Sequence, residues 1–368
     1  MKYTETGFRA IYHNFVVVEA DEQLKKLIED FPGAADANAV LAYGYYDREA
    51  GLSLEVLAAA IIGEKGFQFA RGKQDVTAKI RVGSIADREF RVCSDTDGSI
   101  AAGFAGKLET LKIYEASEEI GHTREMAFLD ALRDETYIDD VRVKLLKEGM
   151  QPEECWVRLT GHGVFFLKGT LLNEPYQQLG IHEGDALEFF AEKTADEEII
   201  CYADLDQVKI YGEEELEDGS ILKAAVKAYQ ENAAKPRLLN VLRILRSSYV
   251  WIPCTAVMSE ADNERFEAVM REHEEKGESA KGTEFRAEDP IRMIPSLLKN
   301  GEKVYFPVFS NEGEMGEGAR QFSKLQKPFV EALPLAREKD KDISAIILDP
   351  FTDPFLIDPE LFDDIEKL

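Results

Sequence analysis

The sequence predicts a multidomain α+β protein made of three successive units. At 368 residues the chain exceeds the ~250 residues at which a single hydrophobic core usually stops growing. The spacing of apolar residues changes near residue 136 and again near residue 235, each time beside a charged or proline-containing connector. We therefore expect an N-terminal α+β unit at 1–136, a small β-rich unit at 137–232 and a C-terminal α/β unit at 233–368.

In the first unit, some apolar residues have the spacing of a helix and others that of a strand. Apolar residues 15–18 predict a strand, and the spacing of the leucines that follow Asp21 predicts a helix. The apolar run 54–62, with Ser53 as its N-cap, predicts a buried helix. The remaining elements are strands at 78–82 and 90–93, a hairpin turn at 97–98 and a helix at 123–133.

The second unit contains five short strand patterns separated by glycine-bearing turns. This spacing is typical of a small sheet or a partly open barrel. The strands are predicted at 141–146, 155–159, 163–169, 186–190 and 199–202. An acidic run at 213–218 then leads into a helix at 220–232.

The third unit alternates helices and strands. An amphipathic helix at 237–246, RLLNVLRILR, leads into a strand at 249–253, YVWIP. A charged helix is predicted at 259–276 and an exposed loop at 277–283. Strands at 304–309, VYFPVF, and 343–348 complete the series, and Asp349, Pro350, Phe351 and Thr352 follow the last strand.

This order of elements resembles the enhanced-serine-sensitivity B (SseB) family, in which a similar helix, two proline-containing strands and a final "I-I-x-N-P-F" strand occur. Asp349 stands where that family usually has Asn. The resemblance implies an α/β domain of a bacterial protein and a link to serine metabolism, but it implies no reaction.

The middle unit has a second resemblance. The motifs are E-x-x-W-V in the strand that contains Trp156, G-x-L-x-N-x-P ending at Pro175, and G-D-x-x-x-F beginning at Gly184. Together they resemble an uncharacterised bacterial domain family whose relatives recur beside polymorphic toxins as presumed immunity proteins. The resemblance implies a role in protein–protein interaction.

The composition limits the partners. The formal net charge of −27 would repel phosphate groups, so we expect neither nucleic-acid nor anionic-membrane binding. A basic protein partner would instead be attracted. The N-terminus lacks the apolar segment of a signal peptide, and no apolar stretch approaches membrane-spanning length, so we expect a cytoplasmic protein.

The best candidate site lies in the second unit, where Asn173 and Glu174 are followed by His182 and Asp185. A histidine near carboxylates can act in acid–base catalysis. Asn-Glu-Pro and Gly-Asp are also turn sequences, and the turn interpretation is favoured, with a partner-binding edge next and catalysis last. No metal site or cofactor is expected.

The segment around Asp349 and Phe351 alternates aromatic residues, prolines and acids. It either docks on its own domain or binds a partner in a groove. We therefore expect a non-enzymatic interaction protein, of an immunity or regulatory type, that acts through an acidic surface. The alternatives are an enzyme with its active site at a domain crevice near His182 and Asp185, and a regulator linked to serine metabolism.

Overall fold

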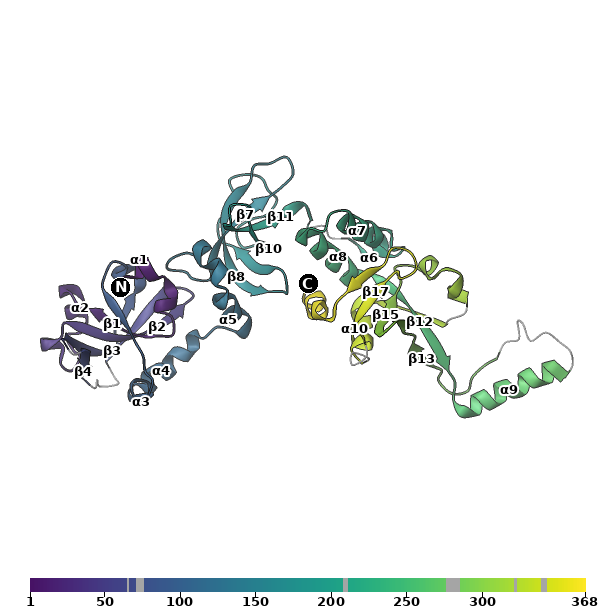
Figure 1. Ribbon diagram of the computed structural model, residues 1–368, viewed down its shortest axis with the longest axis horizontal. Helices are drawn as coiled ribbons and strands as arrows, with labels where there is room; N and C mark the ends of the chain where they lie inside the picture. Colours follow the sequence, from purple (N-terminus) through teal and green to yellow (C-terminus); the bar gives the residue numbers. More distant parts are fainter. Residues whose placement is uncertain (65, 71–75, 208–210, 276–284, 321–322, 339–342) are drawn as a thin grey trace. The chain divides into compact units, whose positions relative to one another are not determined.

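The computed structural model describes residues 1–64, 66–70, 76–207, 211–275, 285–320, 323–338 and 343–368 (Figure 1). It is a multidomain α+β structure that divides into two compact units, residues 1–205 and 206–368. The first unit contains an open sheet followed by a barrel, and the second contains two smaller sheets with helices. The finer division into three domains stays a prediction, and the predicted loop at 277–283 lies outside the described residues.

The N-terminal sheet has the order β4-β3-β2-β1-β6, and β5 also pairs with β3. Every pairing in it is antiparallel. Its strands are β1 (Phe15–Glu19), β2 (Ala39–Asp47), β3 (Gly51–Gly63), β4 (Gly66–Phe69), β5 (Lys79–Arg81) and β6 (Phe90–Cys93). The helices are α1 (Tyr3–Thr6), α2 (Glu22–Leu27), α3 (Ser99–Gly103), α4 (Ala105–Leu111) and α5 (Glu118–Glu125).

Both faces of this sheet are buried, which corrects one prediction. On β1, Val16 and Val18 belong to one hydrophobic cluster and Val17 to the cluster on the other face. The apolar run at 54–62, predicted as a helix, lies in β3, because a strand covered on both faces needs no polar alternation. The side chain of Ser53 accordingly does not cap a helix but donates to the Gly51 carbonyl oxygen at 2.9 Å.

The connection from the sheet to the barrel also differs from the prediction. The helix predicted at 123–133 is instead the end of α5 followed by a 3-10 segment, Ala127–Leu132. Asp97 and Gly98 do form a turn, but this turn precedes α3 rather than joining two strands. The short helix α4 continues into a 3-10 turn, η4 (Lys112–Tyr114).

The five strands predicted for the middle unit are present and close into a barrel, in the order β10-β11-β7-β8-β9 (Figure 1). They are β7 (Asp140–Leu146), β8 (Glu153–His162), β9 (Leu167–Leu171), β10 (Ala186–Lys193) and β11 (Ile199–Asp204). Successive strands run antiparallel, so the odd number makes the closing pair, β11 with β7, parallel. Pairing every strand on both sides leaves no open edge.

Side chains that alternate along the strands fill the barrel. Cys155, Val157 and Leu159 of β8 all point into its core. Gly169 of β9 packs against them, and a Cβ there would lie 2.3 Å from Cγ1 of Val157. Only glycine therefore permits this close packing.

A buried ion pair joins the sheet to the barrel within the first unit. The Arg124 guanidinium, on α5, donates to both oxygens of Asp139, each at 2.8 Å. Arg124 also donates to the Tyr12 hydroxyl at 2.6 Å. Asp139 lies just before β7 and is fully buried. Together these hydrogen bonds connect three segments of the first unit, around residues 12, 124 and 139.

The second unit contains two sheets, β13-β12-β16 and β14-β15-β17-β18, linked by a bridge between Trp251 and Phe309. This confirms the strands predicted at 249–253 and 304–309. The strands are β12 (Tyr249–Val257), β13 (Arg292–Pro295), β14 (Leu298–Asn300), β15 (Lys303–Val308), β16 (Ser323–Pro328), β17 (Ala345–Leu348) and β18 (Phe355–Ile357). The helices are α6 (Glu213–Leu216), α7 (Ser220–Glu231), α8 (Lys235–Ser247), α9 (Glu260–Glu275), α10 (Phe329–Arg337) and α11 (Phe362–Lys367).

Helix α7 belongs to the second unit by its contacts. The sequence boundary at residue 232 placed it with the barrel instead. Its apolar face buries Leu222 and Val226, and it packs against α8. The amphipathic pattern predicted the helix, while the choice of packing partner depended on the tertiary fold.

All four cysteines are free and buried. None of the helices within the described ranges is both long enough and apolar enough to cross a membrane.

Candidate functional site

The predicted residues Asn173, Glu174, His182 and Asp185 come together in one loop. This loop, residues 172–185, connects β9 to β10, and we call it the barrel-end loop. In an up-and-down barrel, alternate connections meet at the same end, so the loop lies beside the β7–β8 turn. Lys147 of that turn donates to the Leu179 carbonyl oxygen at 2.7 Å. Leu179 itself is buried in the barrel core and attaches the loop there.

Side-chain hydrogen bonds hold the first half of the barrel-end loop. The Asn173 side-chain oxygen accepts from the backbone N–H of Trp156 at 2.8 Å. The Glu153 carboxylate accepts from the backbone N–H groups of Tyr176, at 2.6 Å, and Gln177, at 3.1 Å. Partial burial tends to raise the pKa of Glu153, but these hydrogen bonds outweigh it and hold the pKa below its ordinary value.

The second half of the loop is held by two further carboxylates. Oδ2 of Asp185 accepts from the backbone N–H of His182 at 2.8 Å. Oε2 of Glu174 accepts from the N–H of Glu183 at 3.0 Å, and Oε1 lies 2.8 Å from Nδ1 of His182. Each carboxylate thus fixes a backbone position as well as carrying charge.

Glu174 and His182 form an exposed hydrogen-bonded pair, which is an ion pair when His182 is protonated. The hydrogen bond that the protonated His182 ring donates to Glu174 raises the pKa of His182 above its usual value of 6.5. The hydrogen bond from the Glu183 backbone, followed by that from His182, lowers the pKa of Glu174. The side chains of His182 and Glu174 are 71% and 57% exposed, so solvent screens the pair.

Tyr176 is the residue that the held loop presents to solvent. Its side chain is 98% exposed, although Pro175 beside it is buried. A tyrosine ring buries considerable apolar area when it contacts a partner, and its hydroxyl can form a hydrogen bond there. Residues 172–185 contain no Lys or Arg and three carboxylates, those of Glu174, Glu183 and Asp185.

Three of the four predicted residues, Asn173, Glu174 and Asp185, accept hydrogen bonds from the backbone. Nδ1 of His182 is engaged by Glu174, a contact that also orients imidazoles in acid–base catalysis, whereas Asp185 bonds to the backbone of His182 rather than to its ring. None of the four predicted residues lines any cavity that we describe. Within the described ranges, no group of three or more His, Cys, Asp and Glu side chains is placed to hold a metal ion.

The other two predicted residues, Asp349 and Phe351, lie in the second unit. Asp349 is only 2% exposed and has a left-handed φ of 47°. Its carboxylate accepts from the Ser310 N–H at 2.8 Å and from the Ser310 hydroxyl at 2.6 Å. Burial raises the pKa of Asp349, and the hydrogen bonds from Ser310 oppose this change. A carboxylate so enclosed contributes little to an acidic surface.

Phe351 is 60% exposed and packs against Phe309 with a ring-centroid separation of 5.6 Å. The next residue, Thr352, hydrogen-bonds to Glu314, which also pairs with Lys223 of α7. These contacts dock the start of the segment on its own unit. Asp353 and Asp358 remain exposed on it.

Sequence reasoning missed the two residues that define the loop surface, Tyr176 and Glu153. Tyr176 follows Pro175 directly in a turn sequence, which was a signal for exposure. The hydrogen bond from Tyr176 to Glu153 spans 23 positions and depends on the register of β8 and β9, which no local pattern fixes.

Comparison with known proteins identifies part of the second unit. Residues 222–362 match the family model of the SseB protein N-terminal domain. The match begins within α7 and covers less than half of the chain. It does not reach the barrel, so the resemblance of the middle unit to an immunity-associated family stays an interpretation. No curated protein and no solved structure matches the chain.

Proposed function

We propose that this protein binds a basic protein partner through the barrel-end loop and acts by that contact rather than by catalysis. The observation that carries the proposal is the exposure of Tyr176, 98%, on a loop that hydrogen bonds hold in one conformation. An inhibitor or regulator of this type needs no chemistry of its own, because occupying a basic active site or docking surface is sufficient.

Preorganisation supports binding at this loop. The backbone at residues 176 and 177 is held by Glu153, and that at 182 and 183 by Asp185 and Glu174. A partner therefore meets a surface whose conformational entropy is already reduced, which lowers the cost of association. Tyrosine is among the residues enriched at energetically dominant positions of interfaces.

Charge supports a basic partner. The loop carries Glu174, Glu183 and Asp185, all exposed, and the whole chain carries a net charge of −27. Such a surface accelerates the encounter with a positively charged protein and discriminates against acidic ones.

Site-specific photo-cross-linking tests the proposal. The full chain is produced in its native cell with p-benzoylphenylalanine at position 176, and a matched protein carries it at position 164. Val164 is 54% exposed but belongs to the β8–β9 turn, at the opposite end of the barrel. We expect one basic protein to cross-link at 176 and not at 164, and the purified partner to bind Tyr176→Ser at least about tenfold more weakly.

Three results would count against the proposal. One is equal cross-linking at the two positions, and another is a partner with a net negative charge. The third is an unchanged affinity in Tyr176→Ser.

A further inference from the structure

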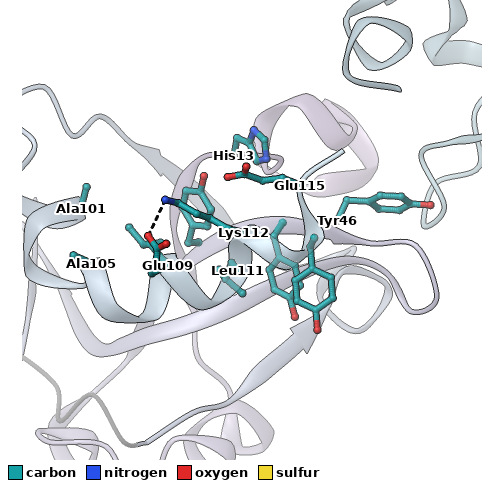
Figure 2. A pocket seen from close by; sticks show the side chains of 12 residues that line it. His13, Tyr46, Ala101, Ala105, Glu109, Leu111, Lys112 and Glu115 are labelled. Atoms are coloured by element: carbon teal, nitrogen blue, oxygen red, sulfur yellow. Dashed lines mark ion pairs between the residues drawn. The ribbon is translucent and has the colours of Figure 1, made fainter. Parts of the chain in front are cut away.

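The first unit contains a cavity lined by tyrosines, away from the barrel-end loop. It has a volume of about 330 Å³ and lies between β2 and the segment formed by α3, α4 and η4 (Figure 2). Tyr43 and Tyr45 line it from β2, and Tyr114 closes it from the η4 side. Cavities of this size hold small ligands. A second cavity of about 470 Å³ shares Tyr46, Tyr114 and Glu115 with the first.

His13 borders the cavity in a strained backbone conformation. Its φ of 57° is in the left-handed region, which non-glycine residues seldom occupy. The backbone holds it there, since the His13 N–H donates to the Gly44 carbonyl oxygen at 2.9 Å. Gly44 in turn cannot carry a side chain, because a Cβ would lie 1.9 Å from the Ile11 carbonyl oxygen. Strain of this kind collects at ligand-binding sites.

Among the described residues, some of the charged side chains around the cavity are paired with each other, and one is not. The Lys112 ammonium is paired with Glu109 at 2.8 Å, so its charge is compensated. Glu115, which both cavities share, forms no ion pair within the described ranges. Figure 2 shows its carboxylate beside the imidazole of His13. Partial burial, followed by the nearby Arg124, lowers the pKa of His13 although Glu115 opposes the change, so the neutral ring is favoured at pH 7.

Tyrosines in this region already contact cations. The Lys79 ammonium lies 5.5 Å from the Tyr114 ring centroid and 5.8 Å from that of Tyr45. The Tyr45 hydroxyl is buried and has no hydrogen-bond partner within the described ranges. Tyr43 contacts no cation in this way among the described residues, and its ring is nearly parallel to that of His13, with centroids 6.4 Å apart.

We infer that this cavity binds a small organic cation, with its ammonium group between the carboxylate of Glu115 and the ring of Tyr43. The electron-rich faces of tyrosine rings attract quaternary and primary ammonium groups, and a nearby carboxylate strengthens the attraction. A neutral His13 adds no repulsion. Nothing in this inference depends on the proposed function of the barrel-end loop.

Isothermal titration calorimetry on the full chain tests the inference with defined probes. The cations are choline, tetramethylammonium and putrescine. The matched neutral probe is 3,3-dimethyl-1-butanol, which has the shape of choline without its charge. We expect at least one cation to bind saturably and the neutral probe to bind at least about tenfold more weakly than choline does.

Variants assign the binding to the cavity. We expect Glu115→Gln and Tyr43→Leu each to weaken cation binding by about tenfold, while Tyr43→Phe retains it because the ring face is unchanged. Glu118→Gln removes an exposed carboxylate at the start of α5 that does not line the cavity, and should change nothing. If Tyr43→Leu fails to fold, Glu115→Gln still tests the inference, because Glu115 is exposed. Failure of all three cations to bind, equal binding of the neutral probe, or full affinity in Glu115→Gln would overturn the inference.

Discussion

The carboxylate of Glu153, on β8, accepts a hydrogen bond from the backbone N–H of Tyr176 at 2.6 Å while the ring of Tyr176 is almost fully exposed. The two residues have different roles in the barrel-end loop. Glu153 fixes the backbone, and Tyr176 supplies the contact surface. The loop is thus rigid where it joins the barrel and accessible where a partner would meet it.

Removing this attachment should loosen the loop without unfolding the barrel. We expect Glu153→Ala to speed hydrogen exchange at the amides of Tyr176 and Gln177 by about tenfold, since each loses a charge-assisted hydrogen bond. Glu154→Ala is the matched control, because the neighbouring Glu154 only pairs with Arg142 at the surface. Equal exchange in the two variants would show that Glu153 does not hold the loop.

The ion pair of the loop should appear in the titration of His182. We expect its pKa, followed by NMR, to lie above 6.5 and to fall toward that value in Glu174→Gln. Because the folded-state pKa is raised, any stability from the pair is present below pH 6.5 and is lost as the pH rises through the raised pKa. A His182 pKa that is the same in both proteins would contradict the pairing.

Removing one partner of the buried pair of Arg124 and Asp139 should destabilise the first unit strongly. We expect Arg124→Met to lower its free energy of unfolding by about 3–5 kcal/mol, because the enclosed carboxylate of Asp139 loses two hydrogen bonds of 2.8 Å and keeps a longer contact, of 3.6 Å, with Arg48. Replacing both, in Arg124→Met with Asp139→Leu, should recover most of the loss.

Tryptophan fluorescence can follow the first unit alone. The chain has two tryptophans, Trp156 and Trp251, one in each unit, so a Trp251→Phe background leaves Trp156 as the reporter. Arg142→Met, which breaks an exposed pair, is the control and should change stability by less than about 1 kcal/mol. A double variant no more stable than Arg124→Met would count against the explanation.

The charge on Asp349 should be unfavourable at neutral pH. We expect Asp349→Asn to raise the free energy of unfolding of the second unit by about 1 kcal/mol at pH 7. An amide keeps an acceptor for the Ser310 N–H without enclosing a charge, and Asn tolerates a positive φ.

The pH dependence of this difference follows from the raised pKa of Asp349. Below the ordinary value of 3.8 the carboxyl is protonated in both folded and unfolded states, so the penalty is absent. The stability gap between the variant and the original protein should therefore widen as the pH rises from about 4 to 7. Asp353→Asn, exposed on the same segment, should show no such gap, and a gap independent of pH would be contrary to this account.

Much of the fold could be predicted from local patterns. The barrel strands alternate inward and outward residues between glycine-bearing turns, and α8 has an amphipathic repeat. β3 was missed because it is apolar on both faces, and periodicity alone does not separate such a strand from a buried helix. Barrel closure also could not be predicted, because it depends on the pairing of β11 with β7.

The candidate site, like the fold, could be predicted only where its contacts are local in sequence. Turn chemistry identified Asn173, Glu174 and Asp185, whose contacts are within the loop or its neighbouring strand. The burial of Asp349 was missed because Ser310, its partner, is 39 positions away. The tyrosine-lined cavity was missed because its walls come from three segments, around residues 13, 43–46 and 101–115.

The rate of association with the partner that cross-links at position 176 is the most direct test of electrostatic binding by the barrel-end loop. The loop variant is Glu174→Gln with Glu183→Gln and Asp185→Asn, in which each amide keeps an acceptor oxygen. The matched control is Asp196→Asn with Glu197→Gln and Glu198→Gln, which removes equal charge from the β10–β11 turn at the opposite end of the barrel. We predict that the loop variant associates about tenfold more slowly at about 10 mM salt and nearly normally at about 0.5 M, with the control close to the original protein throughout. Association rates that ignore salt, or that fall equally in the two variants, would contradict the proposal.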